Sequence, residues 1–295
     1  MNYFQRNAKV VVILACIAAS TSAVFVRIAE DVPSMAVGFY RLSFTMPFLS
    51  IPALTVYRKE LTTLSRKQLT GSLLAGLFLF LHFLTWFMGI VRTTVASAVI
   101  LCTLHPIFVL LITAIVFRDK IKLKPVAGVI VALIGASIVA GGDFSFSGDA
   151  IVGDLLALSA AFFMAMYLVF GNKLRPGISA AAYVFLVFGS CWIFFALGML
   201  VTDTPFTGYS YKSLSAIFAM AMICQIGAHA VFNWCLGYVS PLYIATTETG
   251  EVIFAGILAF LFFSEAPALW QYIGGGITIC GIFIYNYFEA EDSKV

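Results

Sequence analysis

Charged residues are scarce in this sequence. Lysine, arginine, aspartate and glutamate together make up 11% of the 295 residues, whereas 62% are hydrophobic. A typical soluble domain has about 25% charged residues, and a soluble fold cannot keep this much apolar surface away from water. A protein whose outer surface faces lipid can, because the interior of a bilayer is itself apolar. The composition therefore predicts a membrane protein.

Signatures of catalysis and of cofactor binding are also missing. All six cysteines fall in apolar runs and none forms a CxxC pair, which predicts free buried thiols. No HExxH motif occurs, and Gly189-Ser190-Cys191 has no partner histidine on an evident facing helix, so an intramembrane enzyme is not expected. The run Gly274-Gly275-Gly276 predicts close helix packing, because a phosphate loop needs a strand-to-helix setting. We expect no metal, no cofactor and no nucleic-acid partner.

The sequence does contain apolar segments of the length that crosses a bilayer, which is about 20 residues for a helix. Short polar or Gly/Pro connections separate ten of them. The predicted fold is therefore an all-α polytopic membrane protein with ten transmembrane helices. The segments are approximately 8–28, 34–56, 69–91, 93–117, 123–141, 151–170, 179–201, 212–237, 241–263 and 268–288.

Basic residues fall mainly on one side of these ten segments. With the N-terminus in the cytoplasm, thirteen of the 17 lysines and arginines lie inside and three lie outside, with Arg41 in the second segment. Because cytoplasmic loops carry the excess of basic residues, both termini are predicted to be cytoplasmic. Basic inner loops also suit contact with lipid headgroups. A bacterial inner (plasma) membrane is the expected location, with a eukaryotic organelle as the alternative.

The chain contains an internal repeat, in which residues 95–140 match residues 241–286 at an offset of 146. Five predicted crossings separate equivalent positions, and an odd number inserts the two halves in opposite orientations. The predicted units are residues 1–141 and 142–295, two inverted five-helix repeats, an architecture common among transporters. Matching positions are Phe117-Arg118-Asp119 with Phe263-Ser264-Glu265, Gly128 with Gly274, and Gly135 with Gly281.

Each half thus closes its fourth helix with an acidic residue and continues into a glycine-spaced helix. Together with His105-Pro106 and Glu251, this pattern resembles the EamA branch of the drug/metabolite transporter superfamily over about residues 8–288. The resemblance implies a central cavity lined by helices 1, 3, 4, 6, 8 and 9, with Ser20 and Tyr167 as cavity residues. It also implies transport of amino acids or other small metabolites, in a branch that includes exporters, importers and exchangers.

Two carboxyls lie within the ninth segment, where a charge costs about 2.5–3.5 kcal/mol on insertion scales. Glu248 and Glu251 are three residues apart and share a helical face. Two carboxyls this close in a low dielectric are not expected to ionise together, so one is predicted to hold a proton. They either bind substrate and a coupling proton or hold the repeats together by a hydrogen bond.

His105 is the repeat counterpart of Glu251, and the two are predicted to face each other across the cavity. Pro106 weakens the helix and permits a bend, which suits a gate. His82 and Trp86 are four residues apart and would form one polar and aromatic wall. The alternatives are a hydrogen-bonded core histidine with an inconsequential kink for His105 and simple packing for Trp86.

Gln225, His229 and Asn233 form a polar stripe at a spacing of four residues in the eighth segment. Such a stripe turns away from lipid and either lines the pathway, which we favour, or bonds a neighbouring helix. Arg41 lies about seven residues from the outer end of its segment. We predict that it snorkels to the interface, with binding of a substrate carboxylate as the alternative.

These features favour a secondary active transporter for a small polar metabolite, with an amino-acid-like exporter as the first hypothesis and proton coupling through Glu251 or Glu248. The second hypothesis is an importer or exchanger of a cationic or nucleoside-like compound such as S-adenosylmethionine. A channel is disfavoured because the sequence shows no ring of like charges and no repeated filter segment. The expected partners are a small-molecule substrate, protons and membrane lipids.

Overall fold

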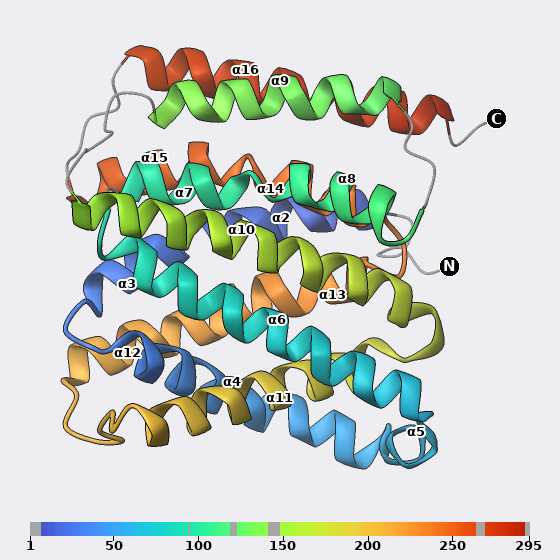
Figure 1. Cartoon of the computed structure of the whole chain (residues 1–295), viewed down its shortest axis with the longest axis vertical. Helices are drawn as coiled ribbons and strands as arrows, with labels where there is room; N and C mark the ends of the chain where they lie inside the picture. The colour runs from blue at the N-terminus through green and yellow to red at the C-terminus, as the bar shows by residue number, and fades with distance from the viewer. Residues whose placement is uncertain (1–6, 94, 119–122, 141–147, 264–268, 293–295) are drawn as a thin grey trace.

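A computed structural model of the chain describes residues 7–93, 95–118, 123–140, 148–263 and 269–292 (Figure 1). Every regular element in these ranges is helical, as predicted. Each of the ten predicted segments coincides with one helix or with consecutive helical pieces. The elements are α2 (Ala8–Ser20), α3 (Ser22–Ile28), α4 (Ser34–Thr55), α5 (Arg58–Thr63), α6 (Arg66–Ile90), α7 (Val95–Thr103), α8 (His105–Ile115), α9 (Leu123–Ala140), α10 (Gly148–Leu174), η1 (Arg175–Gly177), α11 (Ala180–Val201), α12 (Tyr211–Met220), η2 (Ala221–Ala230), α13 (Val231–Cys235), α14 (Pro241–Glu248), α15 (Glu251–Phe263) and α16 (Leu269–Asp292).

Within the described ranges, seven helical stretches are long and apolar enough to cross a membrane. Two further apolar helices, Leu123–Ile138 and Tyr272–Phe288, are shorter, and α4 contains Arg41 and two prolines. An integral membrane protein is thereby supported, whereas ten crossings and cytoplasmic termini stay predictions. The motif acids Asp119 and Glu265, and the boundary between residues 141 and 142, lie outside the described residues.

Serines begin several of the helices by accepting a hydrogen bond from a backbone N–H of the first turn. Ser65 forms a capping box with Gln68 at the start of α6, and Ser179, Ser210 and Ser240 cap α11, α12 and α14. Such caps satisfy amide groups that have no partner inside the helix. The boundaries of these helices therefore follow from local sequence.

The pairing of helices is symmetric with respect to the two halves of the chain. The pair α9 with α16, the pair α4 with α11, and the contacts of α7 and α8 with α15 and α14 each join equivalent segments. The pair α6 with α10 has its counterpart in η2 with α2. Exchanging the halves maps this set of contacts onto itself, as a pseudo-twofold axis between two repeats requires.

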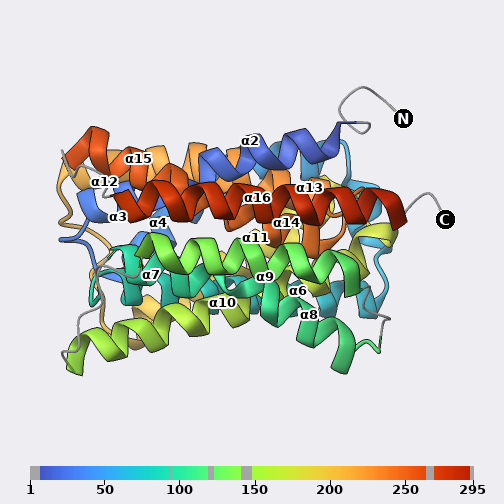
Figure 2. The same cartoon turned by 90° about the horizontal axis from the view of Figure 1, so that it is seen from above.

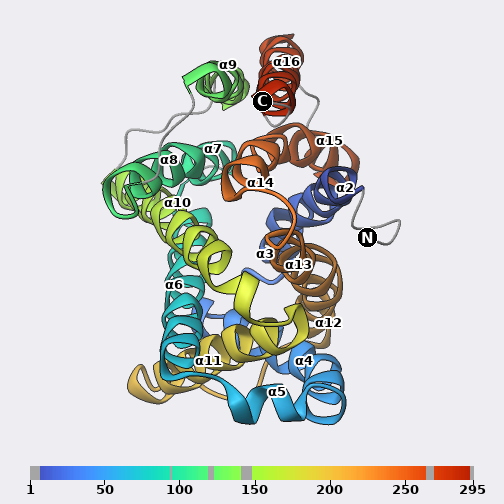
Figure 3. The same cartoon turned by 90° about the vertical axis from the view of Figure 1, so that its right-hand side faces the viewer.

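Helices α9 and α16 form a pair at one end of the bundle, visible from above in Figure 2 and along the helices in Figure 3. Gly128 lies against Tyr285, Ala132 against Gly281, and Gly135 against Thr278, so the two helices are antiparallel. A Cβ atom on Gly281 would lie 2.2 Å from the backbone nitrogen of Ala132. Close packing is therefore present at Gly128, Gly135 and Gly281, and antiparallel equivalents fit inverted repeats. In the run Gly274-Gly275-Gly276 the prediction is wrong for Gly276, where an added Cβ atom would meet nothing within 4 Å.

Candidate functional site

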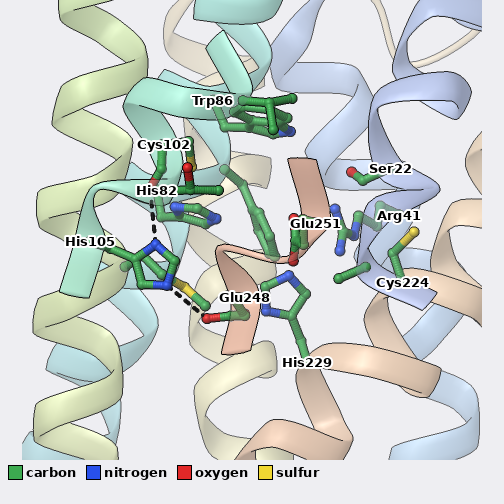
Figure 4. A pocket seen from close by; sticks show the side chains of 15 residues that line it. Ser22, Arg41, His82, Trp86, Cys102, His105, Cys224, His229, Glu248 and Glu251 are labelled. Atoms are coloured by element: carbon green, nitrogen blue, oxygen red, sulfur yellow. Dashed lines mark hydrogen bonds and ion pairs between the residues drawn. The ribbon is translucent and has the colours of Figure 1, made fainter. Parts of the chain in front are cut away.

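A buried cavity lies between the helices of the bundle (Figure 4). Its volume is about 50 Å³, enough for a few water molecules at about 10–15 Å³ each. All six predicted helices contribute to its wall, and α4 joins them through Arg41. The lining residues are Ala19, Ser22, Arg41, His82, Phe83, Trp86, Val99, Cys102, Thr103, His105, Met164, Cys224, His229, Glu248 and Glu251.

Several of the helices at this cavity are broken, and two of the breaks are equivalent in the repeat. One break at Leu104 separates α7 from α8, and the other at Thr249-Gly250 separates α14 from α15. His105 is the first residue of α8 and Glu251 the first residue of α15. Discontinuous helices of this kind place half-helix ends and freed backbone groups at the substrate site of many transporters.

The break in the first half follows from the sequence around Pro106. Proline has no N–H and its ring clashes with the carbonyl four residues earlier, which belongs to Cys102. That carbonyl lies 2.9 Å from His105 Nδ1, which donates to it in place of the missing amide. The predicted bend at Pro106 is therefore present, and His105 is oriented by the carbonyl that the proline leaves free.

The break in the second half contains no proline, and polar side chains bond its freed carbonyls instead. Cys16 Sγ donates to the carbonyl of Thr247 at 3.3 Å, and the Thr249 hydroxyl bonds the carbonyl of Thr246. Gly250 lies between the two helical pieces. Side-chain donors of this kind make irregular backbone tolerable inside a membrane protein.

His105 Nε2 lies 2.9 Å from Glu248 Oε2, and this bond joins the two broken helices. The His105 and Glu248 side chains are 5% and 4% exposed. Because His105 Nδ1 already carries a proton for the Cys102 carbonyl, the bond to Glu248 needs one further proton, on either partner. The pair thus holds one shared proton and has no net charge.

The predicted opposition of His105 and Glu251 across the cavity stays a prediction. Both residues line the cavity, but His105 bonds Glu248, one helical turn before Glu251. The reason is geometric: in a twofold arrangement a residue contacts its own equivalent only on the axis. His105 lies off that axis and contacts the equivalent of Cys102 instead.

His82 and Trp86 form one stretch of the cavity wall on α6, as predicted. His82 Nδ1 donates to the carbonyl of Ala160 on α10 at 2.9 Å, which leaves Nε2 as the free ring nitrogen. The Phe83 ring beside His82 also lines the cavity. Their part in transport stays a prediction.

The polar stripe of the eighth segment is divided between different surroundings. Only His229 is among the residues that line this cavity. Asn233 donates to the Tyr167 hydroxyl and to the carbonyl of His229, and Gln225 is fully buried with neither side-chain polar atom bonded within the described part of the chain. The predicted pathway lining by all three residues, and by Tyr167, does not match this arrangement.

A π-helix is the local reason for this division. Gln225 and His229 belong to the π-helical element η2, whereas Asn233 lies in the α-helix α13. The wider turn changes the angle between residues four apart, so a stripe inferred from α-helical spacing does not stay on one face. Such π segments occur often at functional sites.

Two further cavity predictions need correction. Arg41 does not snorkel: it is 1% exposed, and its guanidinium lies 4.2 Å from the centre of the Phe83 ring. An aromatic face inside the protein gives the cation a favourable position away from the interface. Ser20 bonds the carbonyl of Ile17 in its own helix, and Ser22 lines the cavity in its place. The sequence feature that could have indicated the buried position of Arg41 is a charged residue within an apolar segment.

Apolar helices that enclose polar side chains, with helices broken at the same cavity, are typical of membrane transporters. The chain belongs to the EamA-like transporter family, which it matches twice, over residues 7–141 and 151–287. It is thus a member of the EamA branch of the drug/metabolite transporter superfamily. This assignment points to a transporter rather than an enzyme.

The chain is similar to several curated proteins along most of its length. It is 27% identical to an "uncharacterized transporter" of Archaeoglobus fulgidus, over 89% of this chain and 91% of that protein. It is 21% identical to the human protein "Solute carrier family 35 member G1", over 88% of this chain and 73% of that protein. A crystal structure at 18% identity has a TM-score of 0.75 and covers 96% of this chain and 97% of its own, which shows the fold.

Proposed function

We propose that this protein is a secondary active transporter that exports a small, polar, amino-acid-like metabolite by alternating access. The observation that carries the proposal is the His105–Glu248 bond, which joins two broken helices beside a buried cavity that charged side chains help to line. The cavity holds only a few waters in this conformation, so it must open to admit a metabolite. At both breaks the regular helical hydrogen bonding is already interrupted, so the backbone can bend there at little further cost.

Coupling to protons would use the acids of the ninth segment. The His105–Glu248 pair shares one proton, and Glu251 lines the same cavity. Substrate or a conformational change that separates His105 from Glu248 would force that proton to settle on one partner or leave. The cavity is also lined by Arg41, His82, His229 and Cys102. The charges of these groups therefore influence where the proton of the His105–Glu248 pair moves.

Counterflow in liposomes tests the carrier directly, because exchange of labelled for unlabelled substrate needs no driving force. The panel contains amino acids, polyamines, nucleosides and S-adenosylmethionine. We expect one saturable hit, and we expect Glu251→Gln to keep exchange while losing proton-driven accumulation. Glu30→Gln, an exposed glutamate outside the cavity, is the matched control. Unchanged pH dependence in Glu251→Gln would exclude coupling through this residue.

The second candidate is import or exchange of a cationic or nucleoside-like metabolite, and the two acids at the cavity favour it. Such a cation would lie against Glu251 and shield it from reagents. A cationic metabolite such as S-adenosylmethionine should then protect Glu251 from a carboxyl-directed carbodiimide better than a neutral amino acid does. Equal protection by both would favour the amino-acid-like substrate.

The topology that goes with this mechanism is ten crossings with both termini in the cytoplasm, divided into inverted halves at residues 1–141 and 142–295. A bacterial inner membrane is the proposed location. Reporter fusions after residues 30, 60, 145 and 204 test the alternation. We expect a periplasmic signal at 30, 145 and 204 and a cytoplasmic signal at 60, and any reversal at one site would change the number of crossings.

A further inference from the structure

Arg41 is the buried cation of the cavity, and its side chain is short of acceptors. It enters from α4, is 1% exposed and lines the cavity. Its Nε and Nη2 atoms have no hydrogen-bond partner in the described part of the chain. Figure 4 shows the guanidinium pointing inward among the cavity residues. A buried charge without a hydrogen-bonding counter-ion is costly, so this arrangement indicates that an acceptor is supplied from outside the chain.

The acids of the cavity do not fill that role in the conformation described. Glu248 is bonded to His105, and the pair is neutral overall. No hydrogen bond or ion pair joins Arg41 to Glu251, and both belong to the described residues. The guanidinium carbon lies 4.2 Å from the centre of the Phe83 ring. A ring is no hydrogen-bond acceptor of carboxylate strength, so Nε and Nη2 are left for an acceptor from outside the described part of the chain.

The free edge has a definite chemical preference. Nε and Nη2 are adjacent donors on one side of the planar guanidinium, and together they match the two oxygens of a carboxylate in a side-on bidentate contact. An amine or a sugar hydroxyl cannot satisfy both donors with a compensating negative charge. The edge therefore selects an oxyanion, and a carboxylate is the oxyanion of the amino-acid-like substrate proposed above.

We infer that Arg41 is the substrate's carboxylate-binding residue, and that the transported molecule carries a free carboxylate. This inference rests on the proposed transport function and narrows its substrate class to carboxylate-bearing metabolites. An amino acid would place its carboxylate on Arg41 and its ammonium toward the acids of the ninth segment. Polyamines and simple nucleosides have no group for Arg41 and are excluded as substrates.

The test compares carboxylates with their own carboxamides, which differ in charge and hardly in size. The thermal midpoint of the purified full-length protein is measured with glycine, leucine and lysine, and with glycinamide, leucinamide and lysinamide. We expect at least one amino acid to raise the midpoint at a concentration about 10- to 100-fold lower than its amide, the ratio typical of a charge-assisted bidentate contact. Arg41→Gln should bring that ratio close to one, with Arg41→Lys between them.

Binding and counterflow together separate this inference from the proposed function. Equal stabilisation by acids and amides in the unmodified protein, or an unchanged ratio in folded Arg41→Gln, would overturn the role of Arg41. Counterflow of compounds without a carboxylate would also overturn the role of Arg41, but it would support the proposed transport function. Carboxylate binding through Arg41 without any counterflow would support the site and remove the transport proposal. The comparison in the unmodified protein remains decisive if the Arg41 variants do not fold.

Discussion

The substitutions Glu248→Gln and Glu248→Ala distinguish two properties of the His105–Glu248 pair, its hydrogen bond and its shared proton. His105 Nδ1 is committed to the Cys102 carbonyl, so Nε2 faces Glu248 with a lone pair when the extra proton is absent. A glutamine amide can donate to that lone pair and preserve the contact. Alanine removes the partner altogether and leaves Nε2 buried and unbonded. The two variants should therefore differ strongly in stability.

The expected magnitude follows from burial. The His105 and Glu248 side chains are 5% and 4% exposed, so the unpaired ring nitrogen costs about 1–3 kcal/mol. Glu248→Ala also removes one buried CH₂ group, worth about 0.8 kcal/mol. We expect Glu248→Ala to lower the free energy of unfolding by about 2–4 kcal/mol and Glu248→Gln by less than about 1 kcal/mol.

Reversible unfolding in mixed micelles, titrated with a denaturing detergent and followed by circular dichroism, measures both values. Glu30→Gln is the control for removing a glutamate charge at an exposed position. If glutamine destabilises the protein as much as alanine, the bond requires an ionised carboxylate, and the shared proton resides on His105. If neither variant changes stability, the contact does not hold the two broken helices together.

Two other predictions concern helix packing and the helix break. Gly281→Ala should lower the free energy of unfolding by about 1–3 kcal/mol through overpacking, because its Cβ would lie 2.2 Å from the nitrogen of Ala132. The control is Gly276→Ala on the same helix, where the added Cβ atom meets nothing within 4 Å. This variant should gain up to about 1 kcal/mol of stability from helix propensity. Equal effects in a thermal or detergent titration would contradict close packing of α9 and α16. Pro106→Ala restores an amide that can donate to the Cys102 carbonyl. The free energy of unfolding should therefore stay the same or rise, while counterflow slows several-fold because the helix bends less easily. Unchanged counterflow would show that the break is not a hinge.

Much of the architecture could be predicted from the sequence, because it depends on composition and on one-dimensional spacing. Apolar segments of bilayer length predicted helices that the structure contains, and the offset of 146 predicted equivalent segments that pack in symmetric pairs. Glycines at Gly135 and Gly281 predicted backbone contact, which the structure shows. A glycine in an apolar helix permits close packing, but only the structure shows that Gly281 is packed closely and Gly276 is not.

The partners inside the cavity were decided only by the tertiary structure. The offset equates His105 with Glu251, yet the bond goes to Glu248, because the pseudo-twofold axis does not pass through His105. Arg41 turns inward because the Phe83 ring of another helix receives its guanidinium, and no local pattern encodes that ring's position. These contacts depend on how helices from different parts of the chain are rotated and shifted against one another. Sequence spacing indicates which residues share a face of a regular α-helix, and packing between helices decides which faces meet.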